Sequence, residues 1–556
     1  MKASRVVEVS LVLVLGVAVI GATLALAQKR DDYTFFDELI EVKRAISDRF
    51  VTAPDDAKLR DGAIRGMVEA LNDPYTVYVP ASDAADFNKD LTGEYVGIGA
   101  SVGMQDGWFT IMSPLEDSPA FRAGLMSEDR VVEIDGVTTQ GLSVDQCIDK
   151  LLGEAGTSVR LTIERSGVRQ EVTIVRDRIK TRSVKGFHRS AADPNAWDFV
   201  IDPSRGIAYI RMTQFTPGVT EEIVAALVAA GAEQGKLKGL VLDVRFNPGG
   251  LLNEAEEIAD LFLKDGVIVS TKGRAHAEEI TRAREPGTLP DFPVIILING
   301  QSASASEVLA GALTENNRAM ALGSRSFGKG CVQSVLTMQS GKGSELKLTE
   351  QGYYLPSGRS ITRRDDSPTW GVDPSPGFYV PMTDEEIIAM LEVRRREEVL
   401  RAASPTGSPA APSTEERWND PEWILGHLKD PQLSAAVRAL QSKIDSGSWT
   451  PPGSTQEQKS AIAAEELRRA REVRDRMIRE LERLDRRVTA IEDGTDSSKD
   501  QALSSLWADT IDPTGGTIEI KDKNGNVISR LNITGRDLER WLMDADVKPA
   551  EEGTRN

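Results

Sequence analysis

PVIILINGQSASASEVLAGAL, residues Pro293–Leu313, holds the pattern that decides the fold class. The apolar run Val294–Ile298 ends at an Asn-Gly pair, which is typical of a buried strand followed by a turn. The Ala-rich residues from Ala305 to about Glu315 predict a helix. The serines of SASAS therefore lie at a strand-to-helix turn, where the first helical N–H groups are unpaired and the helix dipole favours negative charge.

The same alternation recurs upstream. GIAYIRM (206–212) and GLVLDVR (239–245) are apolar strand patterns, and VTEEIVAALVAAG and NEAEEIADLFL are amphipathic helix patterns between the strands. Strands that alternate with helices favour a parallel sheet. We therefore expect an α/β core over residues 181–381.

Residues 31–92, before this core, show apolar positions at helical spacing and predict a helical segment. Residues 93–180 change to short strands with Gly-rich turns and one helix, VDQCIDKLLGEAG. The arrangement SPAFRAGLMSEDRVVEIDG, Ser118–Gly136, resembles a PDZ domain. That resemblance implies that a peptide adds as an extra strand and that a Gly-rich turn binds its C-terminal carboxylate. The residues of that turn would be Val96, Gly97, Ile98 and Gly99, unless it is only a loop between strands.

The C-terminal region has a different composition. Residues 382–460 predict a helical segment and the flexible linker SPTGSPAAPS, and residues 461–493 predict one long helix. Met477, Leu481, Leu484, Val488 and Ile491 repeat at coiled-coil spacing, which fits an intramolecular helical hairpin and a homo-oligomer equally well. Residues 494–556 predict a small β-containing tail, in which GGTIEIKDKNGNVISRLNI predicts a hairpin.

Charge and the N-terminus limit the function class. The chain has 556 residues and a net charge of −19, with acids and bases mixed along it. The mixture argues against a nucleic-acid partner, which requires a basic surface. Residues 1–30 combine Lys2 and Arg5 with an apolar run that ends in Ala25-Leu26-Ala27. This pattern fits a cleaved signal peptide and a retained membrane anchor equally well, and both imply that the chain is exported.

Cysteines and histidines are few and scattered. Cys147 and Cys331 are the two cysteines, and we expect them to be separate thiols. The three histidines, His188, His276 and His427, lie in no metal-ligand spacing. We therefore expect neither a metal site nor histidine-based catalysis.

GSRSFGKGC, Gly323–Cys331, contains the G-x-x-x-x-G-K body of a phosphate-binding P-loop. Such a loop requires Ser or Thr after its lysine and must open a helix. Gly330 follows Lys329 instead, and CVQSVLTMQ then alternates as a strand does. A nucleotide hydrolase is therefore disfavoured.

Lys329 can instead act as a general base. Its glycine neighbours would let other backbone segments pack closely around the amine, and desolvation favours the neutral amine that can accept a proton. The serines of SASAS are candidate nucleophiles, although Ser304 and Glu307 also form the S-x-x-E pattern of a capping box, which needs no catalysis. Gln333 shares a strand face with position 329, so its amide could orient the lysine, or it could simply be a surface residue. Asn247-Pro248-Gly249-Gly250, at the end of another strand, could supply an oxyanion donor.

Several of these motifs together resemble the C-terminal processing peptidases, the tail-specific Ser-Lys proteases of peptidase family S41. The resemblance runs from about Tyr33 to Val380. The motifs that carry it are R-x-N-P-G-G, S-A-S-A-S-E, F-G-K-G-x-V-Q and LTEQGYYLPSGRSI.

The resemblance implies a role for each matching residue. Ser304 would be the nucleophile, Lys329 its base and Gln333 the third member that holds the lysine. The oxyanion donors would be the backbone amides of Gly250 and Ala305. Glu315 matches an acidic position of the family but is not assigned a catalytic role.

The implied protein is an α/β multidomain serine endopeptidase with an inserted PDZ domain and a helical C-terminal extension. It would cleave protein or peptide substrates that expose their C-termini, would need no cofactor, and would act in the periplasm or cell envelope, with the membrane as a partner if the N-terminal segment is retained. The PDZ domain could also gate the site. The alternative is a catalytically silent PDZ scaffold.

Overall fold

The computed structural model describes residues 34–84, 87–88, 94–165, 167–190, 193, 196–341, 343–364, 367, 369–398, 417–492, 517–521 and 527–532. The chain forms two compact units, Met1–Ser454 and Thr455–Asn556. The predicted signal peptide or anchor, residues 1–30, lies outside the described residues. Within the described ranges, no helix combines the length and the apolar character that a membrane span requires.

A mixed sheet forms the core of the first unit. β10 (Val184–Lys185) and β13 (Val200–Asp202) pair antiparallel with its strand β14. The parallel strands follow in the order β14 (Ile207–Met212), β15 (Gly239–Asp243), β18 (Val294–Ile298) and β19 (Met320–Gly323). The predicted α/β layer with parallel strands is confirmed.

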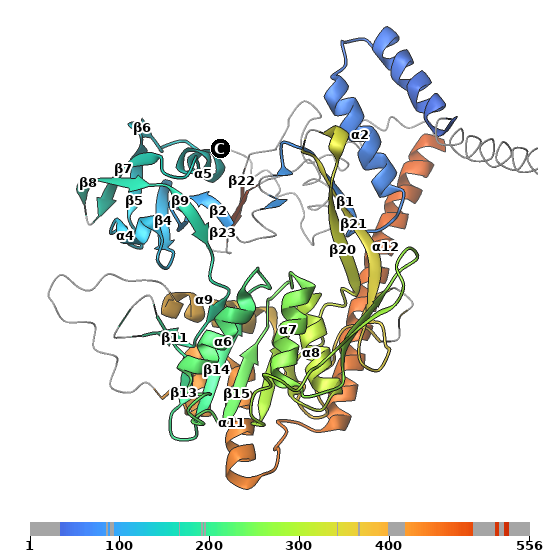
Figure 1. Cartoon of the computed structure of the whole chain (residues 1–556). Helices are drawn as coiled ribbons and strands as arrows, with labels where there is room; N and C mark the ends of the chain where they lie inside the picture. Colours follow the sequence, from blue (N-terminus) through green and yellow to red (C-terminus); the bar gives the residue numbers. More distant parts are fainter. Residues whose placement is uncertain are drawn as a thin grey trace, which may run out of the picture. The chain divides into compact units, whose positions relative to one another are not determined.

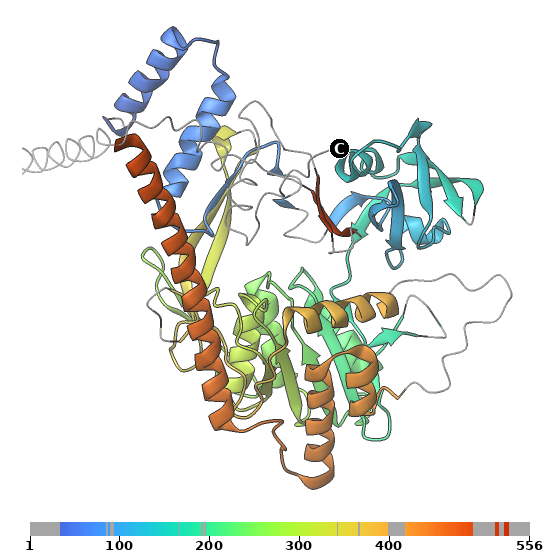
Figure 2. The same ribbon diagram turned by 180° about the vertical axis from the view of Figure 1, so that it is seen from behind.

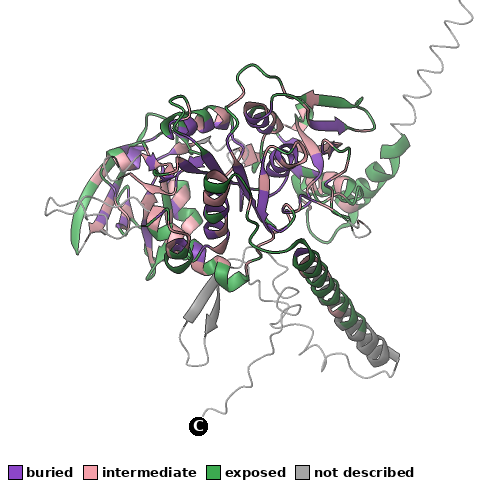
Figure 3. Cartoon of the chain, turned by 90° about the horizontal axis from the view of Figure 1, so that it is seen from below, coloured by how far each residue is buried: buried purple, intermediate pink, exposed green. Residues whose placement is uncertain are grey.

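One face of this sheet is covered by the predicted helices. They are α6 (Val219–Ala229), α7 (Leu252–Phe262) and α8 (Ala305–Glu315), which lie side by side along the sheet (Figure 1). Alternate strand residues such as Ile210 and Leu242 pack against them. Many residues of these strands and helices are buried, and Figure 3 shows buried positions along strands and helices of the molecule.

The opposite face is covered by helices from beyond residue 382. α11 (Pro431–Ser446) packs there with the π-helical turn Ile424–Leu428, and α9 (Asp384–Glu398) lies nearby (Figure 2). Tyr209, Val241 and Leu297 point to this face. Because both faces are buried, the strands are apolar throughout, as the sequence showed. α10 (Pro421–Trp423) leads into the π-helical turn.

A second sheet brings the N-terminal segment next to the middle of the chain. A helix over residues 34–49 and α2 (Asp56–Glu69) precede β1 (Val77–Val79). β1 pairs antiparallel with β21 (Glu345–Tyr354), which also pairs with β20 (Cys331–Thr337) and β16 (Val267–Lys272). β17 (Glu279–Arg282) completes the sheet.

The inserted domain has its own sheet and core. Its strands are β3 (Ala100–Gln105), β4 (Trp108–Pro114), β5 (Arg130–Ile134), β6 (Val137–Thr138), β7 (Ser158–Arg165) and β8 (Val168–Val175). The helices are α4 (Pro119–Arg122) and α5 (Val144–Leu151). β2 (Glu94–Gly97) pairs with β9 (Asp177–Lys180), so the chain enters and leaves the domain at one place. Between this domain and the central sheet, β11 (His188–Arg189) pairs with β12 (Trp197–Asp198).

The second unit contains α12 (Thr455–Glu492) and the antiparallel pair β22 (Thr517–Lys521) and β23 (Val527–Asn532). The predicted long helix and the two hairpin strands are confirmed. The Asn-Gly turn of the hairpin lies outside the described residues. Leu467, Met477 and Leu481 of α12 are exposed, and the choice between a helical hairpin and a homo-oligomer stays a prediction.

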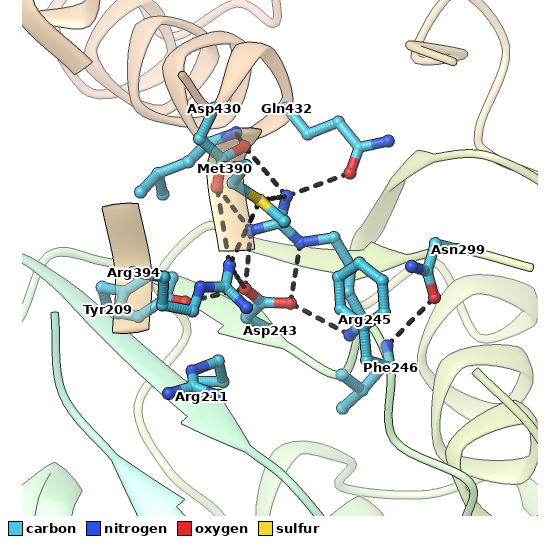
Figure 4. A network of polar contacts seen from close by, with 12 residues as sticks. Tyr209, Arg211, Asp243, Arg245, Phe246, Asn299, Met390, Arg394, Asp430 and Gln432 are labelled. Atoms are coloured by element: carbon cyan, nitrogen blue, oxygen red, sulfur yellow. Dashed lines mark hydrogen bonds and ion pairs between the residues drawn. The ribbon is translucent and has the colours of Figure 1, made fainter. Parts of the chain in front are cut away.

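A buried arginine ties the end of β15 to the helices from beyond residue 382. Arg245 is enclosed, and its guanidinium donates to both carboxylate oxygens of Asp243, at 2.9 and 2.7 Å, and to both of Asp430, at 2.9 and 2.8 Å (Figure 4). Gln432 accepts a further hydrogen bond at 3.0 Å. Burial acts to raise the pKa of Asp243, but the charge of Arg245 holds it well below its ordinary range. The network therefore stays ionised at neutral pH.

Substitution of Asp430 tests this network. Asp430→Asn removes a buried charge and turns amide donors toward Arg245, so we expect the free energy of unfolding to fall by about 2–4 kcal/mol. Thermal and denaturant unfolding of the full chain measure the change. Asp445→Asn is the matched control, because Asp445 pairs with Arg205 at the surface and should change stability by less than about 0.5 kcal/mol. Equal losses in the two variants would contradict the prediction.

Candidate active site

The Ser304 turn connects β18 to α8, as predicted. Ser304 is the residue before α8, and its backbone has φ 56° and ψ −117°. A positive φ is unusual for a residue with a side chain and costs on the order of 1–3 kcal/mol, so the surrounding contacts must hold it. The side chain is nearly enclosed, with 6% of the residue exposed.

The Asn247–Gly250 turn lies directly against the Ser304 turn. A Cβ atom on Gly249 would lie 2.8 Å from the Ser304 Cβ and 3.0 Å from the Ala305 nitrogen, so only glycine allows this approach. The Asn247 carbonyl accepts hydrogen bonds from the Ala303 N–H at 3.1 Å and from the Ser306 hydroxyl at 2.9 Å. The two turns therefore form one backbone unit.

The two amides expected as oxyanion donors both belong to this unit. Ala305 is the first residue of α8, so its N–H has no partner one turn earlier in the helix. Gly250 forms a bridge with Phe215 that uses the Gly249 carbonyl and the Leu251 N–H. The Gly250 N–H itself takes no part in that bridge.

Glu307 joins the Ser304 turn to the loop that carries Lys329. Its carboxylate is fully buried and accepts from the Ser304 N–H at 2.8 Å, which is the carboxylate half of the expected capping box. The same carboxylate accepts from the Ser326 hydroxyl at 2.6 Å and from the N–H groups of Gly328 and Lys329 at 2.6 and 2.8 Å. Burial raises the pKa of Glu307, against the effect of its four donors. The capping interaction and the link between the two loops are thus made by one side chain.

The glycines beside Lys329 are closely packed, as expected. A Cβ on Gly328 would lie 2.7 Å from the Arg363 Cβ, and one on Gly330 would lie 2.6 Å from the Thr362 nitrogen. The lysine itself is half-buried. The element that begins at Cys331, directly after this loop, is strand β20 rather than a helix. The P-loop interpretation is therefore excluded.

Lys329 and Gln333 meet at a third residue, Tyr75. The Lys329 Nζ lies 5.2 Å from the centroid of the Tyr75 ring, and the Gln333 amide nitrogen donates to the Tyr75 carbonyl at 2.7 Å. Across the described residues, no hydrogen bond joins Lys329 to Gln333 or to Ser304. Sequence reasoning missed Tyr75, which follows the turn Asn72-Asp73-Pro74 in the N-terminal segment.

Tyr353 was also missed as a neighbour of Ser304. The Ser304 and Tyr353 side chains interact, and the Tyr353 N–H donates to the Gly330 carbonyl at 3.0 Å. Burial raises the pKa of Tyr353 to about 12, although the interaction with Ser304 acts to lower it. Tyr353 belongs to the stretch LTEQGYYLPSGRSI, so its sequence position did indicate a link to the site.

Other expected residues lie outside this centre. Glu315 is at the far end of α8 and accepts from the Ser357 N–H at 2.8 Å. Cys147 and Cys331 are separate free thiols, as predicted, and both are buried. In the part of the chain that the structure describes, no cluster of three or more His, Cys, Asp or Glu residues could hold a metal ion.

The expected peptide-binding turn begins at the end of β2. Val96 and Gly97 pair with β9, and the carbonyls of Ile98 and Gly99 accept hydrogen bonds from Ala120 at 2.8 Å and Leu115 at 2.9 Å. The turn is thus fixed against α4, the helix of the S-P-A motif. Ser118 caps this helix by accepting from the Phe121 N–H at 3.1 Å.

Three family models match this chain. Residues 206–375 match the family model of peptidase family S41, residues 23–82 that of the activating protease CtpB N-terminal domain, and residues 110–165 that of a PDZ domain. A solved photosystem II D1 C-terminal processing protease is 26% identical, with a TM-score of 0.36, over 65% of this chain and 91% of that chain.

Two curated relatives carry the family name. A carboxy-terminal-processing protease of Bartonella bacilliformis is 34% identical over 443 residues, which cover 78% of this chain and 94% of the relative. The carboxy-terminal processing protease CtpB of Bacillus subtilis is 35% identical over 356 residues, or 63% of this chain and 70% of the relative. This chain belongs to the carboxy-terminal processing proteases, serine proteases of peptidase family S41, and contains a PDZ domain.

Proposed function

We propose that this serine protease cleaves peptide bonds with Ser304 as nucleophile and Lys329 as its general base. The observation that carries the proposal is the Glu307 carboxylate, which binds the backbone of Ser304 and of Lys329 at once. A nucleophile and its base must be held within hydrogen-bond reach of each other when substrate is bound. A shared buried carboxylate fixes the two loops for that purpose.

Acylation then proceeds in two steps. The Ser304 Oγ attacks the scissile carbonyl while the neutral Lys329 amine takes the hydroxyl proton. The N–H groups of Gly250 and Ala305 donate to the oxyanion, and the lysine returns the proton to the leaving amine. In deacylation the same amine takes a proton from a water molecule that attacks the acyl carbon. The ester bond to the Ser304 Oγ then breaks, and the lysine returns the proton to this oxygen.

In this scheme Gln333 positions the Lys329 amine. Its amide binds the Tyr75 carbonyl, and the ring of that tyrosine contacts the Lys329 amine. Gln333 would therefore act on the lysine through Tyr75 rather than by a direct hydrogen bond.

We further propose that the PDZ domain binds the C-terminus of the substrate at Val96–Gly99. The support is the short turn after β2, which follows a strand already paired on one side with β9. An added peptide strand would place its carboxylate at the N–H groups of this turn. Binding there would select proteins that expose their C-termini and would hold them near the protease core.

Export and self-association are proposals that rest on sequence. The basic and apolar pattern of residues 1–30 supports export to the periplasm or cell envelope, with or without retained attachment to the membrane. N-terminal sequencing of the native protein tests whether the segment is removed.

Exposed apolar residues of α12 support a homo-oligomer. Sedimentation of the full chain with and without residues 455–492 tests this self-association.

Removal of either reacting group should abolish cleavage. We expect Ser304→Ala and Lys329→Ala to lower kcat/KM on an unfolded, fluorescently labelled protein by at least about 1,000-fold. The melting temperature should stay close to that of the native chain. Lys272→Ala is the matched control, because Lys272 also contacts a tyrosine ring, that of Tyr354, but outside the site. If the native chain and both site variants leave every substrate intact, the alternative of a silent PDZ scaffold is favoured.

Glu307→Gln tests the link between the two loops. The amide turns its NH₂ group toward backbone donors, so at least one of the four hydrogen bonds is lost. We expect kcat to fall by about 10- to 100-fold, because small displacements of reacting groups are costly. Steady-state kinetics at neutral pH measure the effect, and an unchanged kcat would show that the link is not needed.

Amidation of the substrate's C-terminus tests PDZ recognition. A protein substrate with a free C-terminal carboxylate should show a KM about tenfold lower than the same substrate with a C-terminal amide, since the charge-assisted hydrogen bonds to the turn are lost. The kcat values should stay similar. Identical KM values for the two substrates would contradict recognition of the carboxylate.

A further inference from the structure

Tyr75 reaches the active site from the N-terminal segment, in the turn between α2 and β1. Asp73 organises this turn by accepting from the Tyr75 N–H at 3.2 Å and from the Thr76 hydroxyl at 2.6 Å. Burial acts to raise the pKa of Asp73, but hydrogen bonds from Thr349 and Thr76 hold it below its ordinary value. The turn is therefore built around an ionised carboxylate at neutral pH.

The same turn is fastened to the strands that follow the lysine. The Thr349 N–H donates to the Thr76 hydroxyl at 3.1 Å, and Val77 of β1 pairs with Lys347 of β21. Gln333, which faces Thr349 across β20 and β21, donates to the Tyr75 carbonyl. These contacts fix the Tyr75 backbone on both sides.

These contacts place the Tyr75 ring next to the Lys329 amine, and the Lys329 Nζ lies 5.2 Å from the ring centroid. Burial raises the pKa of Tyr75, with the nearby Cys331, Glu307 and Asp73 adding to the effect, so its hydroxyl stays neutral. A neutral aromatic ring attracts an ammonium group through its negative face. It gives no such attraction to a neutral amine.

We infer that Tyr75 is a positioning residue of the protease, and that its ring stabilises the ammonium that Lys329 forms when it takes the Ser304 proton. The inference rests on the proposed Ser304–Lys329 catalysis. Because the ammonium is formed during the chemical step, the ring acts on the transition state more than on the bound substrate. The N-terminal segment thus contributes directly to catalysis.

Tyr75→Leu removes the ring and keeps the backbone carbonyl that Gln333 requires. We expect kcat on an unfolded, fluorescently labelled protein to fall by about tenfold, within the range that cation–π contacts give at partly buried sites. KM should change by less than about twofold, because the substrate does not use this contact. Tyr75→Phe retains the ring and should keep kcat within about threefold of the native value.

Tyr78→Leu is the matched control. Tyr78 lies on β1 in the same segment, is more buried than Tyr75, and pairs with Leu346 rather than with the lysine loop. Its loss should lower the melting temperature while it changes kcat less than Tyr75→Leu does. An unchanged kcat in Tyr75→Leu, an equal loss in Tyr75→Phe, or an equal loss in Tyr78→Leu would each overturn the role of the ring.

Lys329→Ala in the same assay separates the two hypotheses. If Lys329→Ala is inactive and Tyr75→Leu cleaves normally, only the role of Tyr75 is wrong. If Lys329→Ala cleaves as the native chain does, the assignment of the base is wrong, and the proposed role of Tyr75 is overturned with it.

Discussion

Glu307 is a buried carboxylate surrounded by four donors, and the candidate active site depends on it. The donors come from the Ser304 turn and from the Ser326–Lys329 loop, which are separate in the sequence. A carboxylate has enough lone pairs to accept all four, whereas an amide or a hydroxyl would leave donors unpaired in the interior. The strained backbone of Ser304 persists because this acceptor and the Asn247 carbonyl hold the residues around it.

A second buried charge lies just before the other turn of the candidate site. Arg245 precedes the turn that carries Gly250, and its guanidinium is held by Asp243 on one side and Asp430 on the other. A buried ion pair adds little net stability compared with apolar packing, but it allows only one geometry. The strand that leads into the Gly250 turn is therefore held to the helices on the far face of the sheet by Arg245.

Much of this arrangement could be predicted from the sequence, because it follows from local patterns. The run Val294–Ile298 before SASAS predicted the strand-to-helix turn, and the alternation after Lys329 predicted a strand. The contacts of Gln333 could not be predicted, since its partner Tyr75 lies 258 residues away. The packing of α11 on the sheet was also missed, because a helical pattern predicts a buried face and does not identify what covers it. The domain boundaries drawn from the sequence stay predictions.

The long separation between Arg245 and its partners has a consequence for synthesis of the chain. Asp430 and Gln432 follow Arg245 by 185 and 187 residues, so the arginine acquires these partners only after nearly the whole first unit has been made. A chain that ends where the S41 match ends, at residue 375, would bury Arg245 against Asp243 alone and leave one face of its sheet bare. We therefore expect a chain that ends before α11 to be less stable, and the first unit to complete its core only late in synthesis, once α11 has been made.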